Sequence, residues 1–246
     1  MLLLVDIGNS STTFGISNGK NEYFRWYIPT DIIGKKDSFQ KSQIKNLKKG
    51  GINPQRVSAV VICSVVPKLN KIIKKHCQGI FTKSRFFLIS KDIQIPIKNK
   101  YKRPEQVGHD RLVNALAVKS FYRLPVLVVD FGTAITIDVV SKKGEYLGGV
   151  IVPGINLSLK ILYENTALLP LLNPRKPKAV LGKDTENSIL SGIFYGYSFL
   201  VDGLIKKLKT TLSSAPLVVA TGGNLKIMKP LCREVDHYQP NLTLIG

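Results

Sequence analysis

Two stretches of the sequence place an aspartate between an apolar strand and a glycine turn, where a carboxylate can hold a metal-bound phosphate. The first stretch is Asp6-Ile7-Gly8-Asn9-Ser10-Ser11-Thr12-Thr13. An aspartate at a strand end can hold Mg²⁺ directly or through water, and the glycine lets the backbone approach a phosphate closely. The asparagine and the hydroxyl groups offer hydrogen-bond donors to phosphate oxygens. The alternative is a structural hairpin that is rich in serine and threonine.

The second stretch, Asp130-Phe131-Gly132-Thr133, repeats this chemistry 124 positions after the first. The repeat extends over residues 4–13 and 128–137. In each copy an apolar strand is followed by a glycine turn with hydroxyl residues and then by a second β-rich run. A structural hairpin has no need to repeat its aspartate. The pairing therefore favours two phosphate-binding turns that face each other across a cleft.

Two further motifs bear on the same chemistry. Residues 218–224 form a predicted buried strand that ends in Gly222-Gly223, which suits the approach of a flat group such as adenine, although glycine pairs also simply end strands. Gly108-His109-Asp110-Arg111 opens a predicted helix. Its aspartate is either a first-turn acid favoured by the helix dipole or a general base beside an anion-binding arginine. A kinase that phosphorylates an alcohol needs one carboxylate to deprotonate the attacking hydroxyl.

Strands and helices alternate around these motifs. Apolar residues at helical spacing predict helices over residues 38–49, 67–76, 107–122, 155–162 and 185–212. Thr185 is expected to cap the last helix, with Ile189, Ile193 and Leu200 on one side. Buried strands are predicted over residues 57–63 and 217–220, and third strands over 23–28 and 146–152. The hairpin signal Asn18-Gly19 precedes the first of these third strands.

This order of elements occurs twice and predicts an α/β fold of two ribonuclease-H-like domains. The domains are expected to span residues 1–124 and 125–246, with a ligand cleft between them.

The composition limits the classes of protein that need to be considered. The chain has 246 residues, of which 44% are hydrophobic, enough for one large domain or two small ones. The apolar start ends at Asp6, too early for a secretory signal, and Asp130 and Asp138 interrupt the longest apolar run, so no membrane span is expected. The cysteines are few and odd in number, which predicts reduced thiols in the cytoplasm, and no zinc site is expected because the histidines lie at no ligand spacing from them. They are Cys63, Cys77 and Cys232.

The net charge is +20, and such an excess can mark a nucleic-acid-binding protein. Here the 28 lysines far outnumber the 8 arginines, they are scattered, and no basic patch is interleaved with aromatic residues. We therefore expect a diffuse attraction for anionic substrates and no specific nucleic-acid partner.

In chain order, the two aspartate turns and the Gly222-Gly223 strand resemble the phosphate-1, phosphate-2 and adenosine motifs of the actin-like ATPase superfamily, which includes sugar kinases. No Gly-x-x-x-x-Gly-Lys-[Ser/Thr] loop is present. Together with Gly108–Arg111, the Gly-Gly-x-Ile-x-Pro-Gly motif at Gly148–Gly154 and the Thr185 region, they resemble type III pantothenate kinases over nearly the whole chain. Related sequences are also called Bvg accessory factors, a name that refers to a regulatory role.

The resemblance implies an ATP-dependent kinase that converts pantothenate to 4′-phosphopantothenate, the first step of coenzyme A biosynthesis. It implies a cytoplasmic homodimer whose substrate site lies near the subunit interface. Asp6 to Thr13 and Thr133 would bind ATP, and Asp110 would accept the hydroxyl proton. Asp130 would bind a monovalent cation, K⁺ or NH₄⁺, and Asp6 would hold Mg²⁺.

The resemblance also implies a set of residues that line the pantothenate site. His109 fills the variable position of its motif, so its side chain is assigned no role of its own. The lining residues would be Tyr101, Gly108, His109, Asp110, Arg111 and Thr185.

Two other functions stay open from the sequence. One is a different small-molecule kinase or a polyphosphate phosphatase on the same fold, because the ATP motifs do not identify the acceptor. The other is a non-catalytic regulator that binds ATP or DNA. The +20 charge supports the regulator, and the intact aspartates Asp6, Asp110 and Asp130 argue against it.

Overall fold

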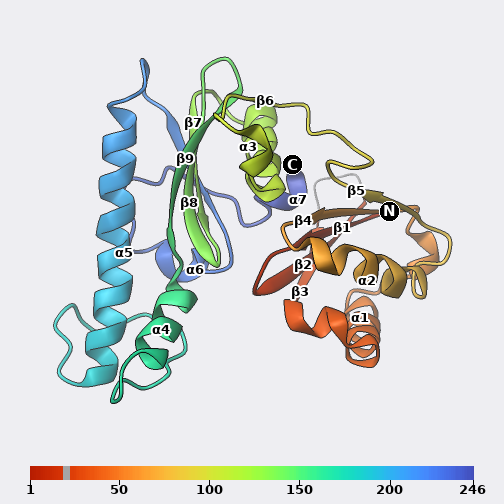
Figure 1. The fold of residues 1–246 in the computed structure, drawn as a ribbon, viewed down its shortest axis with the longest axis horizontal. Coiled ribbons are helices and arrows are strands. Elements are labelled where there is room, and N and C mark those ends of the chain that lie inside the picture. Colours follow the sequence, from red (N-terminus) through yellow and green to blue (C-terminus); the bar gives the residue numbers. More distant parts are fainter. Residues whose placement is uncertain (19–22) are drawn as a thin grey trace. The chain divides into compact units, whose positions relative to one another are not determined.

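A computed structural model describes residues 1–18 and 23–246, and the chain forms two compact units (Figure 1). Unit 1 comprises Met1–Pro96, Glu105–Asn114 and Thr243–Gly246, and unit 2 comprises Ile97–Pro104 and Ala115–Leu242. The predicted division into residues 1–124 and 125–246 follows the sequence repeat and stays a prediction. Gly19 of the predicted hairpin turn lies outside the described residues.

Unit 1 is built on a five-stranded sheet in the order β3-β2-β1-β4-β5. The central strand β1 runs antiparallel to β2 and parallel to β4. The strands are β1 (Leu2–Ile7), β2 (Ser11–Ser17), β3 (Tyr23–Pro29), β4 (Ala59–Ser64) and β5 (Arg85–Leu88). The helical segments between them are η1 (Thr30–Gly34), α1 (Lys36–Lys49), η2 (Pro54–Arg56) and α2 (Pro67–Gln78).

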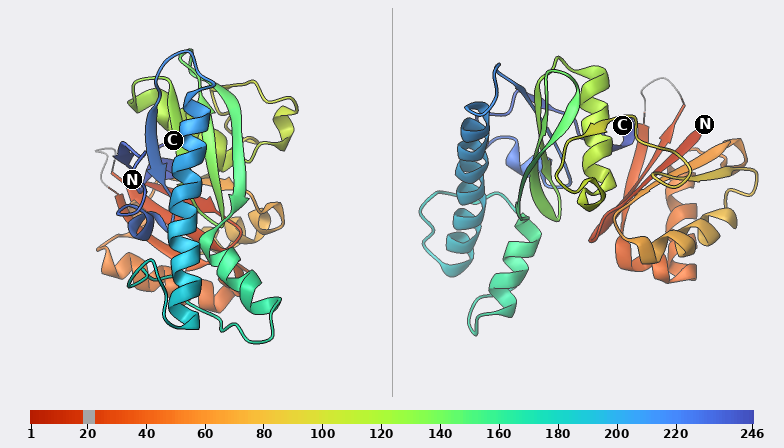
Figure 2. Two further views of the ribbon diagram at one scale, coloured as in Figure 1. Left: turned by 90° about the vertical axis from the view of Figure 1, so that its left-hand side faces the viewer. Right: turned by 45° about the horizontal axis from the view of Figure 1, so that its top comes forward.

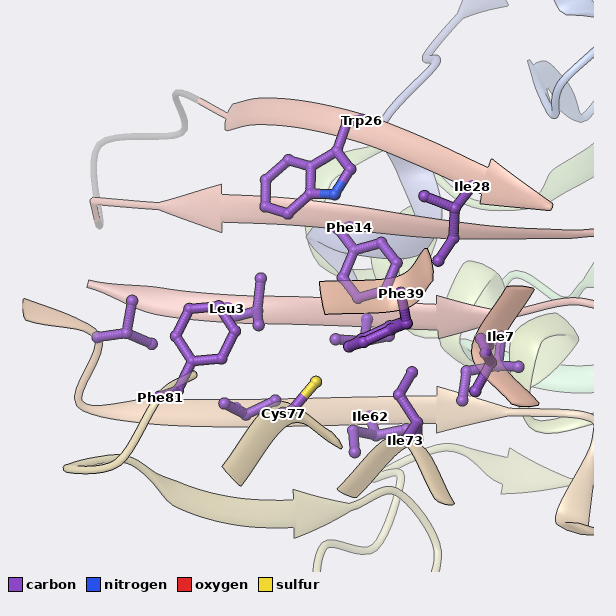
Figure 3. Packing of buried hydrophobic residues seen from close by; sticks show 14 of the residues in the cluster. Leu3, Ile7, Phe14, Trp26, Ile28, Phe39, Ile62, Ile73, Cys77 and Phe81 are labelled. Atoms are coloured by element: carbon purple, nitrogen blue, oxygen red, sulfur yellow. The ribbon is translucent and has the colours of Figure 1, made fainter. Parts of the chain in front are cut away.

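Alternation along β1 separates a fully buried face of this sheet from a partly exposed one. Leu3, Val5 and Ile7 are buried in one hydrophobic cluster with residues of α1 and α2, whereas Asp6 belongs to the opposite face. Figure 3 shows the cluster from close by, with Phe14 between Trp26 and Phe39. The rings of Phe14 and Trp26 are stacked, with centroids 5.4 Å apart. The apolar face thus fixes β1 and leaves its other face available for chemistry.

Unit 2 contains a six-stranded sheet in the order β11-β10-β7-β8-β9-β6. The central strand β7 runs antiparallel to β8 and parallel to β10. The strands are β6 (Lys98–Asn99), β7 (Val126–Phe131), β8 (Ala134–Val140), β9 (Glu145–Pro153), β10 (Leu217–Thr221) and β11 (His237–Tyr238). The helices of the rest of the chain are η3 (Pro104–Gln106), α3 (His109–Phe121), α4 (Ile155–Glu164), α5 (Thr185–Lys209), α6 (Leu225–Met228) and α7 (Leu242–Ile245).

The two sheets have the same connectivity. If the strands of each are numbered in chain order from its central strand, both read third, second, first, fourth, fifth, and β6 is an extra strand at one edge of the second. This is the ribonuclease-H-like α/β arrangement, and it occurs twice, which confirms the predicted fold class. The aspartate turns of the repeat connect β1 to β2 and β7 to β8.

Both faces of the second sheet are covered. Leu127, Val129 and Phe131 of β7 pack into a cluster with α4 and α5, and the alternate residues Val126 and Val128 are fully buried as well. Figures 1 and 2 show α5 on one side of the sheet and the part of α3 that belongs to unit 2 on the other. Burial on both faces explains why β7 reads as a continuous apolar run.

The long helix α5 differs from its prediction in two respects. Its N-cap is Asp184, whose Oδ1 accepts a hydrogen bond from the N–H of Asn187 at 2.7 Å, so the expected cap by Thr185 is wrong and Thr185 is the first helical residue. The buried stripe is Leu190, Phe194, Val201 and Ile205, offset from the predicted side, and Leu200 is exposed. A carboxylate caps at least as well as a hydroxyl, which favours the aspartate.

Helix α5 is also the helix of the described chain that is long and apolar enough to cross a membrane by length and composition. Within its most apolar window 39% of the helix is buried in the protein. The cluster around Phe194 and Val201 accounts for the buried side.

The aromatic cluster of unit 1 predicts the effect of a truncation. We expect Phe14→Ala to lower the free energy of unfolding by about 3–5 kcal/mol, because it removes a fully buried ring and leaves a cavity. Phe121→Ala is the matched control, since that ring is 60% exposed, and it should change the stability by less than about 0.5 kcal/mol. Urea unfolding measures both, and equal effects of the two substitutions would contradict the packing described.

Candidate active site

The turn between β1 and β2 holds the first predicted phosphate motif. Asp6 is partly buried near the end of β1, and Asn9, Ser10 and Ser11 are exposed. The N–H of Gly8 donates to the carbonyl of Ser11 at 3.1 Å, and a Cβ at Gly8 would lie 3.0 Å from that oxygen. The turn therefore needs a glycine to stay tight, and its tightness leaves the hydroxyl-rich segment at the surface.

Thr12 belongs to the support of this turn. It is fully buried, and its hydroxyl lies 3.0 Å from the hydroxyl of Thr30. Thr30 in turn donates its hydroxyl to the carbonyl of Gly8 at 2.8 Å and its N–H to the carbonyl of Ser10 at 3.0 Å. Thr30, the first residue of η1, thus supports the turn through hydrogen bonds to its backbone and to Thr12. The sequence analysis missed this role of Thr30.

The predicted general base lies at the start of α3, within unit 1. Asp110 is the second residue of the helix, and its Oδ1 accepts a hydrogen bond from the N–H of Arg111 at 2.8 Å. A Cβ at Gly108 would lie 2.5 Å from that same oxygen and 3.5 Å from Val65. The glycine therefore lets the helix start pack against the end of β4 with the carboxylate folded over it.

Cys63 of β4 links the two aspartates of unit 1. It is the parallel partner of Asp6 in the sheet, while Thr13 is the antiparallel partner on the other side. Burial and the negative charges of Asp6 and Asp110 raise the pKa of the Cys63 thiol well above its ordinary value. Cys63 is therefore a neutral thiol at physiological pH, and both carboxylates lie close enough to act on it.

In unit 2, Asp130 occupies the same place on β7 that Asp6 occupies on β1. A Cβ at Gly132 would lie 3.3 Å from Asp130 Oδ1. Gly222, directly after β10, has a φ of +104°, and a Cβ there would lie 2.5 Å from both Asp130 Oδ1 and the backbone nitrogen of Phe131. Two glycines thus make room for one carboxylate.

The Gly148–Gly154 motif reaches the same turn. The N–H of Gly154 donates to the carbonyl of Thr133 at 2.9 Å, and a Cβ at Gly154 would lie 2.2 Å from that oxygen. Gly154 is also the N-cap residue of α4. Asp130, Thr133, Gly154 and Gly222 therefore gather at one turn of unit 2.

The remaining predicted site residues are distributed over both units. His109 and the buried Arg111 lie on the first turn of α3 in unit 1. Tyr101 follows β6 in unit 2, and its ring lies against Tyr146. Thr185 is exposed at the start of α5, which Figures 1 and 2 show beside α4 and at the opposite end of unit 2 from β6. Within unit 2, Thr185 and Tyr101 are thus not brought together.

Both aspartate turns suit hard cations. Each offers a strand-end carboxylate with hydroxyl and carbonyl oxygens nearby, the donors that Mg²⁺ and alkali cations prefer. The glycines at positions 8, 132 and 222 keep space that a Cβ would fill. Among residues 1–18 and 23–246, no three histidine, cysteine or acidic side chains gather into a metal cage. A cation at either turn would therefore take part of its coordination from phosphate oxygens or water.

Comparison with known proteins identifies the family. The sequence profile of the type III pantothenate kinases matches residues 2–207. A type III pantothenate kinase of Syntrophus aciditrophicus is 37% identical over 246 residues, which cover all of this chain and 96% of the relative. A second, from Anaeromyxobacter sp. strain K, is 39% identical with the same coverage. The chain belongs to the type III pantothenate kinase family.

A solved structure has the same fold. A crystal structure described as a conserved Baf family transcriptional activator from Campylobacter jejuni superimposes with a TM-score of 0.57, at 21% identity, over 98% of this chain and 92% of that one. At this level of identity the likeness shows the fold alone. The resemblance to type III pantothenate kinases inferred from the motifs is confirmed by the family match.

The sequence reasoning missed Cys63 and Gly154 as neighbours of the two turns. Cys63 reaches Asp6 only through the pairing of β1 with β4, and two strands, α1 and two 3₁₀ turns separate these strands in the sequence. Gly154 was noted as part of a family motif, but its contact with Thr133 depends on the register of β8 and β9. Neither contact has a local signal in the sequence.

The two glycines after β10 provide a matched pair for testing the Asp130 turn. Gly222→Ala should lower the free energy of unfolding by about 1–3 kcal/mol through backbone strain alone, and it should weaken ATP binding because Asp130 must move. Gly223→Ala is the control, since a Cβ there meets nothing within 4 Å. Urea unfolding and calorimetric titration with ATP measure the two effects. Wild-type behaviour of Gly222→Ala would contradict the assigned geometry.

Proposed function

We propose that the chain transfers the γ-phosphoryl group of ATP to the primary hydroxyl of pantothenate and so makes 4′-phosphopantothenate for coenzyme A biosynthesis. The observation that supports this most directly is membership of the type III pantothenate kinase family along the whole chain. The proximity of Asp110 and Asp6 to the same thiol within unit 1 is consistent with a phosphoryl acceptor held close to a phosphate-binding turn.

In the proposed reaction, Asp110 accepts the proton of the pantothenate hydroxyl. The hydroxyl oxygen of pantothenate attacks the γ-phosphorus of ATP, and ADP leaves. The N–H of Arg111 holds Asp110 Oδ1, which orients the carboxylate before substrate arrives. Phosphoryl transfer asks for little covalent work, so most of the rate enhancement comes from positioning and charge. Tyr101, Gly108, His109 and Arg111 would contact pantothenate, and residues 6–13 with Thr133 would contact ATP. Thr185 would contact pantothenate as well, and since it lies at the other end of unit 2 from Tyr101, it would do so from a second copy of the chain.

Two cations belong to this proposal. Magnesium would be held by Asp6, and a monovalent cation, K⁺ or NH₄⁺, by Asp130; when bound, they supply positive charge that offsets the negative charge of the polyphosphate. We place the activity in the cytoplasm, where thiols stay reduced, because Cys63, Cys77 and Cys232 are all free and buried.

The decisive experiment measures ADP release from ATP and Mg²⁺ with and without pantothenate, each in K⁺ and in Na⁺ buffer. We expect release only when pantothenate is present, and faster release in K⁺. Release without pantothenate would indicate an ATPase or another acceptor. No release from folded protein under any of these conditions would favour a binding protein over an enzyme.

The role of Asp110 has its own test. Asp110→Asn should lower the turnover number by about 10²–10⁴, the usual contribution of a general base, while the fold is retained. Asp37→Asn is a matched control, because Asp37 is also the second residue of a helix in unit 1 and is exposed. Steady-state kinetics and circular dichroism measure both variants. Wild-type turnover of Asp110→Asn would exclude it as the base.

We also propose that a second copy of the chain covers an apolar surface of unit 2. Large apolar side chains are exposed on the neighbouring helices α4 and α5 and on the segment between them. They are Leu157, Ile161, Tyr163, Leu168, Leu171, Val180, Leu181, Phe199 and Leu200. Apolar exposure on this scale marks a surface that is covered by a partner. A homodimer would cover it and would bring the substrate site near the subunit interface.

The surface predicts an oligomeric state and a variant that disrupts it. Light scattering should give the mass of two chains of 27.2 kDa, and Phe199→Glu should shift it toward one chain, because a charge at a 68%-exposed ring opposes burial. Phe121→Glu is the control, at a ring that is 60% exposed and outside this surface. A monomeric wild type that sediments with lipid vesicles would assign the surface to a membrane instead.

A further inference from the structure

A row of buried polar side chains crosses the second sheet on the face that also holds Asp130. Asp138 is fully buried in β8, where its Oδ1 accepts a hydrogen bond from the hydroxyl of Tyr146 at 2.8 Å and its Oδ2 accepts one from the hydroxyl of Thr136 at 3.1 Å. Tyr146 of β9 is fully buried as well. A buried carboxylate and a buried phenol are tolerated only with such partners, so each group fixes the position of the other.

Tyr146 contacts the predicted pantothenate residue Tyr101. The two ring centroids are 6.3 Å apart and the ring planes are inclined by 46°, within the range of favourable aromatic pairs. On the same strand, Gly148 has a φ of +126°, and a Cβ there would lie 3.3 Å from the Tyr101 ring. The ring of Tyr101 therefore rests on Tyr146 and on the bare backbone of Gly148.

The backbone that leads to Tyr101 is held to the same strand. Asn99 of β6 pairs with Tyr146 of β9, and the N–H of Lys100 donates to the carbonyl of Tyr146 at 2.8 Å. Asn99 Oδ1 accepts the N–H of Tyr101 at 2.9 Å. Since β6 has only two residues, these bonds and the ring contact together set where Tyr101 lies.

Ion pairs add to this attachment. Glu145, next to Tyr146, lies 3.2 Å from the ammonium group of Lys98 and 3.8 Å from that of Lys100. The hydrogen bond from Lys98 lowers the pKa of the Glu145 carboxyl, so Glu145 is charged at neutral pH. Each surface pair contributes little alone.

At its other end the row reaches the Asp130 turn. Thr136, which donates to Asp138, is the cross-strand neighbour of Asp130 in the pairing of β7 with β8. Gly149 is opposite Asp138 in the pairing of β8 with β9, and a Cβ there would lie 2.9 Å from Asp138 Oδ1. One buried carboxylate thus connects the strand that bears a proposed cation residue with the strand that supports a proposed substrate residue.

We infer that Asp138 and Tyr146 are positioning residues that hold Tyr101 in the orientation in which it binds pantothenate. The inference rests on the proposed function, because it concerns the substrate of that reaction. Neither residue touches the reacting atoms; both act through Tyr101.

The first test removes one hydroxyl. Tyr146→Phe keeps the ring and deletes the hydrogen bond to Asp138, and it should raise the KM for pantothenate by roughly three- to tenfold, the range of one hydrogen bond. The KM for ATP and the kcat should stay within about twofold of wild type. Asp138→Asn should stay close to wild type, because the amide still accepts the Tyr146 hydroxyl, whereas Asp138→Ala should behave like Tyr146→Phe.

A matched control separates positioning from stability. Asp202 is another buried carboxylate of unit 2, and it accepts the N–H groups of Arg233 and Glu234 at 2.9–3.1 Å. Asp202→Asn should lower the melting temperature and leave both KM values unchanged. If Tyr146→Phe lowers only the melting temperature or the active fraction, as this control does, the positioning role is overturned.

A double-mutant cycle decides whether Tyr146 acts through Tyr101. In a Tyr101→Ala background, Tyr146→Phe should have no further effect on the KM for pantothenate. An undiminished effect in that background overturns the inference, as does a Tyr101→Ala variant with wild-type KM. These outcomes differ from failure of the proposed function, in which the wild type shows no pantothenate-dependent release of ADP.

Discussion

The architecture depends on keeping a carboxylate at the end of each central strand. A charged side chain on a buried strand has little contact with water, which is energetically costly. The chain therefore turns directly after the aspartate, and this turn leaves space around the carboxylate oxygens. In both units a glycine follows two residues after the aspartate, and the turn that it permits has hydroxyl groups at its edge. In unit 2 a second glycine, Gly222 directly after β10, approaches the same carboxylate. In the turn of unit 2, the carboxylate of Asp130 determines where two glycines are required.

The electrostatics of unit 1 follow from that arrangement. Asp6 and Asp110 come from segments far apart in the sequence, and the residue that both act on is an uncharged thiol. A third negatively charged group at this place would be repelled by both carboxylates. A small, uncharged side chain is compatible with these carboxylates. Cys63 meets that condition, because burial raises the pKa of its thiol and keeps it protonated.

Much of this was predictable from local patterns. The repeat of Asp6 and Asp130, the helix start at Asp110 and the apolar strands β4 and β10 are encoded in consecutive residues, and the structure has them where they were expected. The short edge strands β5, β6 and β11 were not predicted, because two to four residues give no usable alternation. The contacts of Cys63, Thr30 and Tyr146 depend on strand register between distant segments, which no local pattern determines. The cap of α5 was misplaced by one residue because aspartate and threonine are adjacent and both suit that position.

The assignment of Thr243–Gly246 to unit 1 has a consequence for synthesis of the chain. A Cβ at Gly15 of β2 would lie 2.6 Å from Leu244, and the hydroxyl of Thr243 donates to Asn114 Oδ1 at 2.9 Å. These contacts belong to unit 1, yet they involve residues that are translated after all of unit 2. On the ribosome the sheet of unit 1 can therefore assemble early. The surface around Gly15, however, is not covered by Leu244 until all residues of unit 2 have been synthesised. Unit 1 is the first to begin folding and the last to finish.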